Sequence, residues 1–157
     1  GIGVIATTTL LFGLLLGVSY SYRAAGADEQ SISRLDHALI IGLAQALALI
    51  PGTSRSGVTI TASLFLGYNL ATAARFSFLM SIPVIAGALL LMLVKEFELF
   101  FSSANLAVTV LAMLVAAVSA YATIAFFVGL VTRVGMMPFV IYRVLLALIL
   151  FSILVFV

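Results

Sequence analysis

The sequence predicts an all-α polytopic membrane protein with about four transmembrane helices and one re-entrant helical hairpin. Three observations support this fold class. Hydrophobic residues make up 65% of the 157 residues and charged residues only 8%, whereas soluble domains carry about 25% charged residues. Apolar runs of about 20 residues, long enough to cross the hydrocarbon core, recur along the chain. One further apolar stretch is interrupted by PGTSRSG, which begins at Pro51.

The composition also excludes several kinds of site. The chain has no cysteine, which rules out disulfides, Cys-ligated zinc and a thiol nucleophile. His37 is its only histidine, so no two-histidine mechanism can be completed within it. We expect a single integral-membrane domain over 1–157. The sequence begins at Gly1, without an initiator Met, and this residue already lies in an apolar run. We therefore expect the chain to be a fragment of a longer protein.

The lengths of the apolar and polar runs predict the first elements of the chain. Residues 1–20 predict a transmembrane helix, and the polar segment 21–37 predicts an aqueous loop. The apolar runs 38–50 and 58–67 are each half the length of a span and flank the Pro–Gly break, which predicts a re-entrant hairpin over 38–67. The rival interpretation, one continuous helix, conflicts with the proline and the glycines at the break.

The remaining elements are simpler. Residues 72–94 predict a span that contains Pro83, and a short loop follows over 95–104. Two more apolar runs, 105–133 and 138–157, predict the last two spans.

The PGTSRSG stretch predicts a site for an anion. Irregular backbone at membrane depth is tolerated only where it is buried in protein or lines a wet cavity. This loop leads into a helix N-terminus, whose N–H groups and dipole favour an anion. Arg55 adds a guanidinium that fits phosphate bidentately, and Ser54 and Ser56 add hydroxyls, so we expect these three residues to carry the chemistry. The expected substrate-binding residues are Gly52, Thr53, Gly57 and Gln45.

Other interpretations of these residues stay open. Ser54 and Ser56 can cap a broken helix while Arg55 pairs with a carboxylate on a neighbouring segment. A transporter or flippase half could use the same loop to bind an anionic lipid or phosphate without chemistry. Gln45 could reach a headgroup or bond to a neighbouring helix.

The other polar residues are weaker candidates. Arg75 opens a span and is expected to snorkel, whereas Arg143 either snorkels or pairs internally. His37 lies at the aqueous mouth of the hairpin, about 18 Å along a helix from the turn. Glu96 and Glu98 face different sides of a helix and are expected in a solvated loop.

Three segments together resemble the undecaprenyl-pyrophosphate phosphatase family, bacterial membrane enzymes linked to bacitracin resistance. They are LALIPGTSRSGVTI, ARFSFLMSIPVIAGA and MMPFVIYR, in this order. The resemblance covers essentially the whole chain but only the C-terminal part of a family member. It implies a fold similar to inverted-repeat transporters, with two re-entrant hairpins that meet near mid-membrane. This chain would supply one part of that architecture.

The resemblance also implies an activity. The protein would hydrolyse undecaprenyl (polyprenyl) pyrophosphate to the monophosphate and phosphate, which recycles the lipid carrier of peptidoglycan synthesis in the cell wall. Arg55 would bind the pyrophosphate, and Ser54 and Ser56 would position it. The implied cofactor is a divalent cation, magnesium or calcium. The implied location is the bacterial cytoplasmic (inner) membrane.

The chain departs from the family pattern at its N-terminal end. The family's Glu-rich motif and the Ser- and His-containing loop after it have no counterpart between Gly1 and His37. We therefore expect the acidic residues, the nucleophile and all metal ligands in a missing N-terminal half, and we expect this chain alone to be inactive. The expected partners are the polyprenyl pyrophosphate lipid, the bilayer and that half, with no nucleic acid. A homo-oligomer is compatible with the sequence.

Overall fold

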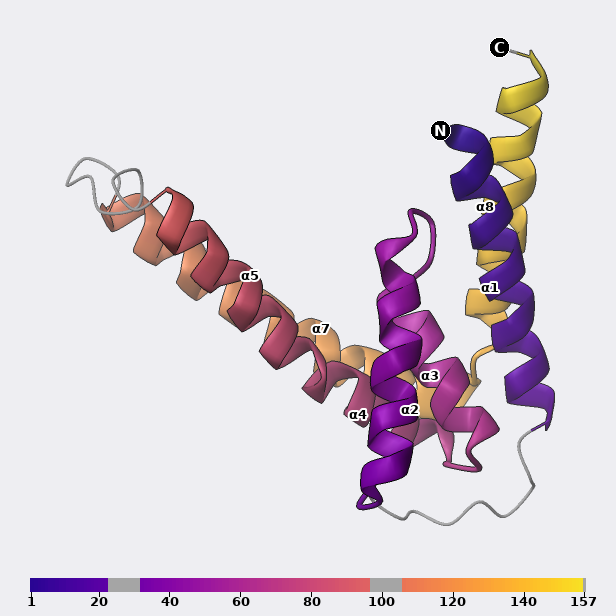
Figure 1. The fold of residues 1–157 in the computed structure, drawn as a ribbon, viewed down its shortest axis with the longest axis horizontal. Helices are drawn as coiled ribbons and strands as arrows, with labels where there is room; N and C mark the ends of the chain where they lie inside the picture. The colour runs from indigo at the N-terminus through magenta and orange to yellow at the C-terminus, as the bar shows by residue number, and fades with distance from the viewer. Residues whose placement is uncertain (23–31, 97–105, 157) are drawn as a thin grey trace.

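The computed structural model describes residues 1–22, 32–96 and 106–156, and these are helical apart from short connections (Figure 1). The first elements are α1 (Ile2–Tyr22), α2 (Leu35–Ala46), the 3₁₀ turn η1 (Leu47–Leu49) and α3 (Arg55–Phe65). They are followed by α4 (Leu70–Leu79), α5 (Ser81–Lys95), α7 (Leu106–Val134) and α8 (Met137–Phe156). The predicted all-α class is confirmed for the part of the chain that the structure describes.

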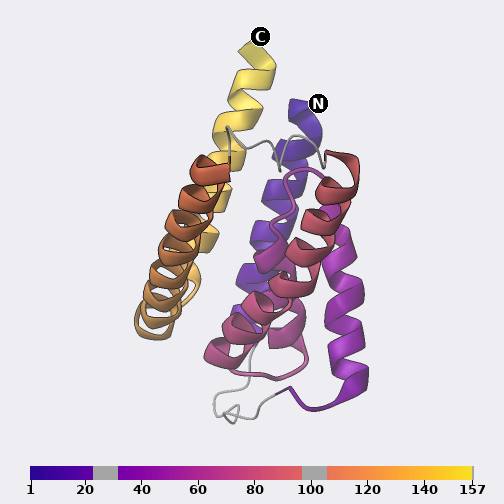
Figure 2. The same cartoon turned by 90° about the vertical axis from the view of Figure 1, so that its left-hand side faces the viewer.

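The protein is a multi-pass membrane protein by the length and composition of its helices. Four described stretches are long and apolar enough to cross a membrane: Ile2–Tyr22, Leu70–Lys95, Leu106–Val134 and Met137–Phe156. Their ends lie within two residues of the predicted spans. α5 and α7 extend away from the α1–α8 pair as separate helices (Figures 1 and 2). Apolar side chains on such helices suit contact with lipid.

The second predicted span contains a break at Met80, where α4 ends and α5 begins. Pro83 lacks an N–H and its ring crowds the carbonyl of Leu79, four residues earlier. The Ser81 hydroxyl donates to the nearby Phe78 carbonyl at 2.5 Å. Such a side-chain bond keeps carbonyls satisfied where a proline interrupts a helix in a membrane.

α1 and α8 pack against each other through small residues of α1. They run antiparallel, so that the two termini lie at the same end of the molecule (Figure 1). A Cβ on Gly13 would lie 3.1 Å from the Cβ of Arg143, and one on Gly17 would lie 3.1 Å from Val140. Glycines four residues apart let two helices approach closely in a membrane. This close approach brings Arg143 to the surface of α1.

The chain breaks between η1 and α3, as predicted. The connection covers residues 50–54, and α2 and α3 pack against each other on either side of it (Figure 1). At the far ends of these two helices, the Nδ1 of His37 and the hydroxyl of Tyr68 are 2.8 Å apart. The start of α2 and the end of α3 therefore lie together, and the loop is the opposite tip of the helix pair.

The core lies where α1, α3, α4, α7 and α8 meet. Its buried members are Leu16, Ile60, Leu64, Leu70, Ala73, Ala74, Val131, Met136 and Val140. α3 packs into this core, and apolar and hydroxyl-bearing residues alternate along its buried surface. One of the hydroxyl oxygens, Thr59 Oγ1, lies 2.7 Å from Ser77 Oγ of α4. The core therefore fixes α3, and with it the loop that leads into α3.

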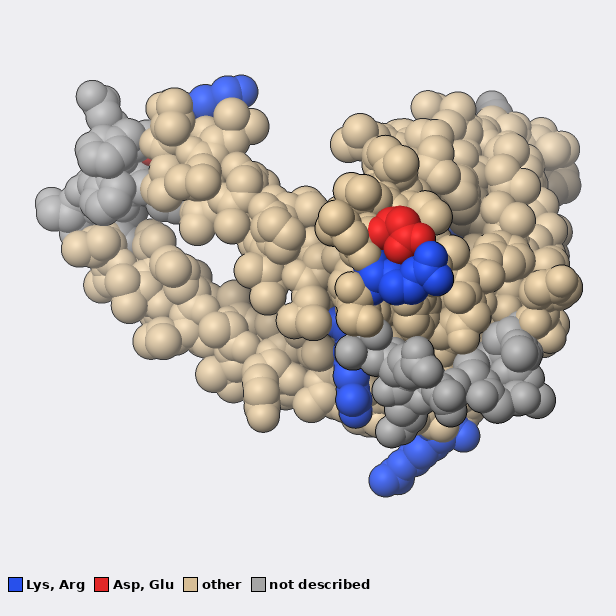
Figure 3. All heavy atoms as spheres, turned by 60° about the horizontal axis from the view of Figure 1, so that its bottom comes forward, with Lys and Arg blue, Asp and Glu red and all other residues tan. Residues whose placement is uncertain are grey.

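The charged side chains at the start of α2 lie at the surface. On the face shown in Figure 3, an acidic and a basic side chain are in contact at the start of α2. Arg34 donates to both carboxylate oxygens of Asp36, at 3.1 and 2.6 Å. This hydrogen bonding lowers the pKa of Asp36 to about 2. Both side chains are exposed, so this end of α2 suits an aqueous environment.

Candidate functional site

The loop before α3 is ordered by its own hydroxyl groups. Ser54 is the N-cap of α3, and its Oγ accepts a hydrogen bond from the N–H of Gly57 at 3.2 Å. The Oγ of Ser56 lies 3.3 Å from that of Ser54. The first N–H groups of a helix lack intrahelical partners and form the positive end of its dipole. Two hydroxyls and this helix end therefore combine to favour an anion.

The same loop is attached to α1. Thr8 Oγ1 donates to the Pro51 carbonyl at 2.6 Å, and Thr9 Oγ1 donates to the Gly52 carbonyl at 3.3 Å. Gly52 has a φ of +89°, and a Cβ there would collide with Thr8 Oγ1 and lie 2.7 Å from the Ile5 carbonyl oxygen. Position 52 thus requires glycine for two reasons, the backbone conformation and the close approach to α1.

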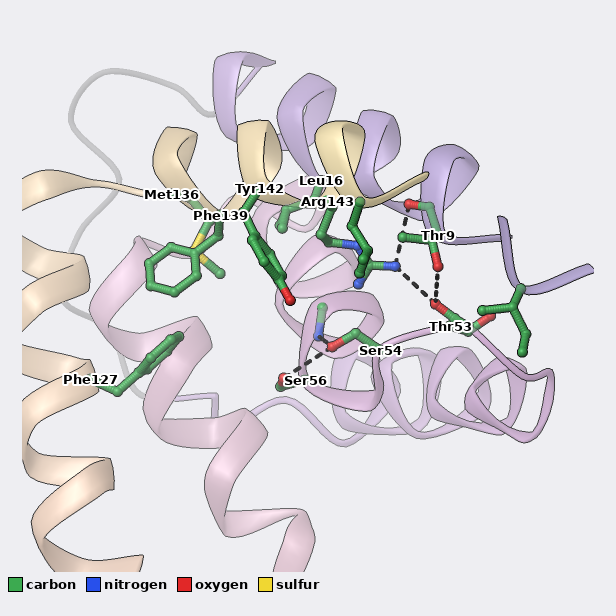
Figure 4. Close-up of a pocket in the computed structure, with 14 residues that line it drawn as sticks. Thr9, Leu16, Thr53, Ser54, Ser56, Phe127, Met136, Phe139, Tyr142 and Arg143 are labelled. Atoms are coloured by element: carbon green, nitrogen blue, oxygen red, sulfur yellow. Dashed lines mark hydrogen bonds between the residues drawn. The ribbon is translucent and has the colours of Figure 1, made fainter. Parts of the chain in front are cut away.

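Arg143 of α8 is the cation that the structure brings to this loop. Its Nη2 donates to the carbonyl oxygens of Gly52 at 3.1 Å and Thr9 at 3.4 Å (Figure 4). A Cβ placed on Gly57 would lie 3.1 Å from Nη1, so the guanidinium also reaches the start of α3. The residue is only 9% exposed. Arg143 therefore links α1, the loop and α8 at the helix end that favours an anion.

One buried polar atom each of Arg143 and Thr53 lacks a hydrogen-bond partner among the described residues. These atoms are the Nε of Arg143 and the Oγ1 of Thr53. Buried polar groups in native proteins are nearly always hydrogen-bonded, so unpaired ones call for an explanation. Both residues line one cavity, where a bound ligand could supply the missing partners.

This cavity has a volume of about 460 Å³ and is polar at one end and apolar at the other. Figure 4 shows Thr9, Thr53, Ser54, Ser56 and Arg143 on one side of it. Phe127, Met136 and Phe139 lie on the other side, and Tyr142 lies between the two groups. The cavity can therefore accommodate a molecule with an anionic head and an apolar chain.

Five of the predicted site residues line this cavity: Gly52, Thr53, Ser54, Ser56 and Gly57. The structure places Arg55 and Gln45 outside its lining. Arg55 is half-buried, and its Nη1 has no hydrogen-bond partner among the described residues, as is also true of Gln45 Oε1. Successive residues of a helix point about 100° apart, so the side chain of Arg55 leaves α3 in a different direction from that of Ser56. The role of Arg55 stays a prediction.

Sequence reasoning did not include Thr9 or Arg143 among the site residues. Of the two interpretations of Arg143, the internal one is confirmed, with backbone carbonyls as its partners. The available signal was weak: an arginine inside an apolar span, and a Gly13–Gly17 spacing in another helix that permits close packing. Nothing in the sequence says that these two helices pair.

The remaining candidates that the structure describes lie outside the cavity lining. Arg75 and Glu96 are exposed, His37 contacts Tyr68, and Glu98 lies outside the described residues. No group of three or more His, Cys, Asp or Glu side chains capable of holding a metal ion occurs within residues 1–22, 32–96 and 106–156. The cavity itself offers hydroxyl and carbonyl oxygens.

The two glycines at the ends of α3 provide a matched stability test. Gly52 and Gly67 have nearly equal φ values, +89° and +90°, but a Cβ on Gly67 would meet nothing within 4 Å. Gly67→Ala is therefore expected to cost only the backbone term, about 1 to 2 kcal/mol. Gly52→Ala adds the overlap with α1 and is expected to cost about 2 to 5 kcal/mol. Thermal unfolding in detergent checks this, and equal losses would contradict the close approach of the loop to α1.

The sequence of this chain is similar to those of known proteins. The sequence matches the family described as Bacitracin resistance protein BacA over residues 1–149. It is 55% identical to the undecaprenyl-diphosphatase of Alcanivorax borkumensis over 147 residues, which cover 91% of this chain and 53% of the relative. Its identity to the undecaprenyl-diphosphatase of Teredinibacter turnerae is 53% over 153 residues, with 94% and 55% covered. The chain spans about half the length of these curated relatives.

Proposed function

Because this chain belongs to the Bacitracin resistance protein BacA family, we propose that it is the C-terminal part of an undecaprenyl-diphosphatase. The full-length protein, meaning this chain joined to the N-terminal half of such a protein, would hydrolyse undecaprenyl pyrophosphate to undecaprenyl phosphate and phosphate. It would do so in the cytoplasmic membrane of a bacterium, where it would recycle a lipid carrier of cell-wall synthesis.

One observation carries this proposal: a single cavity joins an anion-favouring loop to an apolar wall between candidate spans. A lipid pyrophosphate has the same two parts. The unpaired Nε of Arg143 and Oγ1 of Thr53 lie at the end where its phosphates would bind. An anion there would accept hydrogen bonds from both, which would remove the cost of leaving them buried and unpaired.

The residues of the cavity suit phosphoryl transfer in a defined way. In hydrolysis, water adds to the terminal phosphorus and the bond from that phosphorus to the bridging oxygen breaks. Catalysis of such transfer is mostly positioning and stabilisation of charge on the phosphoryl oxygens. We propose that Ser54, Ser56 and the N–H groups of α3 position the phosphates, and that Arg143 stabilises their charge. Arg55 would supply a second guanidinium after its side chain turns toward the cavity.

The depth of the loop supports a re-entrant hairpin. Thr8, which binds the loop, lies about 9 Å from the start of α1 and about 21 Å from its end, at about 1.5 Å per residue. The hydrocarbon core is about 30 Å thick. If α1 crosses the membrane, the tip of the α2–α3 pair reaches well into it, while His37 and Tyr68 remain together at the opposite end. We propose that residues 38–67 enter and leave the membrane on one side.

The implied divalent cation finds no set of ligands among the residues that the structure describes. The oxygens at the cavity are hydroxyls and backbone carbonyls, and no acidic side chain of the described residues lines it. Magnesium and calcium prefer carboxylate ligands. We therefore propose that any such ligands come from the N-terminal half. The roles proposed for the serines and the two arginines do not depend on a metal ion.

The proposed topology also predicts sidedness. A re-entrant hairpin puts the α1–α2, α3–α4 and α7–α8 connections on one face and the α5–α7 connection on the other. The first face would carry Arg23, Arg34, Arg75 and Arg133, and the other would carry Lys95. Arginine and lysine in short loops favour the cytoplasm, so the first face is expected to be cytoplasmic.

Cysteine labelling checks this orientation, because the chain has no native cysteine. Ser31 and Ser103, both outside the described residues, are replaced singly by cysteine in the full-length protein. An impermeant maleimide is expected to label Ser103→Cys in intact cells and to label Ser31→Cys only after the cells are opened. Labelling of Ser31→Cys alone in intact cells would reverse the proposed topology.

The proposed activity is tested by phosphate release from undecaprenyl pyrophosphate in detergent. The purified full-length protein is expected to release phosphate, whereas the 157-residue chain alone is expected to release none above a control. Binding of the lipid by the full-length protein without hydrolysis would instead support the transporter or flippase alternative.

A further inference from the structure

We infer that Phe127, Met136 and Phe139 form a slot that holds the first isoprene units of the substrate's chain and makes the site selective for prenyl over saturated chains. This aromatic slot rests on the proposed function and deepens it. The inference comes from the apolar end of the same cavity, which the chemistry of hydrolysis does not use.

The slot has walls that other side chains hold in place. The rings of Phe127 and Phe139 have centroids 5.1 Å apart and planes inclined by 60°. Phe78 of α4 packs edge-on against Phe127 from outside the cavity lining, with centroids 5.5 Å apart and planes at 85°. Met136 is buried, at 3% exposure. Helices α4, α7 and α8 therefore each fix part of the slot, and edge-to-face contacts stabilise its shape.

The slot lies where the start of the chain must go. A single ester oxygen joins the prenyl chain to the first phosphate, so phosphates at the polar end leave the first isoprene units only the other end of the cavity. Tyr142 stands between the two ends in Figure 4. The slot therefore contacts the first units of the chain, and the remainder can extend into the surrounding lipid.

Selectivity must come from shape and not from hydrophobic burial. A prenyl tail that moves from lipid into the protein exchanges one apolar environment for another, so it gains little from the hydrophobic effect. Close contact with aromatic rings can still distinguish a flat, methyl-branched isoprene unit from a flexible saturated chain. The saturated chain also loses more conformational freedom when it is held.

The test compares farnesyl pyrophosphate with dodecyl pyrophosphate, which has the same backbone length but no double bonds or methyl branches. Both kcat/KM and the rise in Tm on adding each lipid are measured for the full-length protein. Wild type is expected to favour the farnesyl lipid about threefold to tenfold, mainly through KM. Phe127→Leu and Phe139→Leu, which keep apolar volume, are each expected to remove most of this preference while kcat changes little.

Phe126→Leu is the matched control, because Phe126 is adjacent on α7 but 70% exposed and outside the cavity lining. It is expected to keep the wild-type preference. A preference that survives in both Phe127→Leu and Phe139→Leu, or that falls equally in Phe126→Leu, would overturn the slot. The shift in Tm reports binding without turnover. Selective binding with no hydrolysis would therefore reject the proposed activity and still support the slot.

Discussion

Replacing Arg143 with lysine in the full-length protein is expected to lower the hydrolysis of undecaprenyl pyrophosphate by on the order of 10²-fold or more. Arg143 holds the carbonyls of Gly52 and Thr9 with one nitrogen and keeps its Nε unpaired at the cavity. Lysine has one nitrogen and no planar fork, so it cannot bond the loop and an anion at the same time. Phosphate release under saturating substrate, together with KM, measures the loss.

The matched control is Arg75→Lys, because Arg75 is exposed and lies outside the cavity lining. It is expected to change the rate by less than about twofold, since a surface charge is retained. A purely structural role for Arg143 would lower Tm and leave the activity of the folded fraction intact. That outcome, or normal turnover at normal Tm, would remove Arg143 from contact with the phosphates.

Arg55→Lys is expected to cause a loss of similar size, on the order of 10²-fold, and Arg55→Ala at least as much. The physical reason is the unpaired Nη1 of Arg55, which leaves a donor available beside the loop, and the bidentate fit of guanidinium to phosphate. Arg55 does not line the cavity, so this loss requires its side chain to turn toward the bound phosphates.

Comparing the two arginines separates their roles by measurement. If Arg143→Lys loses activity and Arg55→Lys turns over normally at normal expression, Arg143 is the cation that acts on the phosphates and Arg55 has no part in the mechanism. Comparable losses would support two guanidiniums at one lipid pyrophosphate.

The sequence anticipated the helices well because their signals are local. Apolar runs near the length of a membrane crossing gave the four spans, and Pro51 with Gly52 marked the break before α3. It missed the break at Met80, although Pro83 was noted, because a proline within a span can be absorbed without one. The local residue pattern also identified the loop that carries Ser54 and Ser56.

By itself, then, the sequence determined a multi-pass helical membrane protein with a polar loop that suits an anion, because apolar run length, proline chemistry and helix-end electrostatics act over short stretches. Only the tertiary structure decided which cation meets that loop. Gly13 and Gly17 let α8 approach α1 closely, and this packing delivers Arg143 from the far end of the chain. The direction in which Arg55 points was likewise set by the start of α3 at that residue, since helix geometry turns each side chain away from its neighbours.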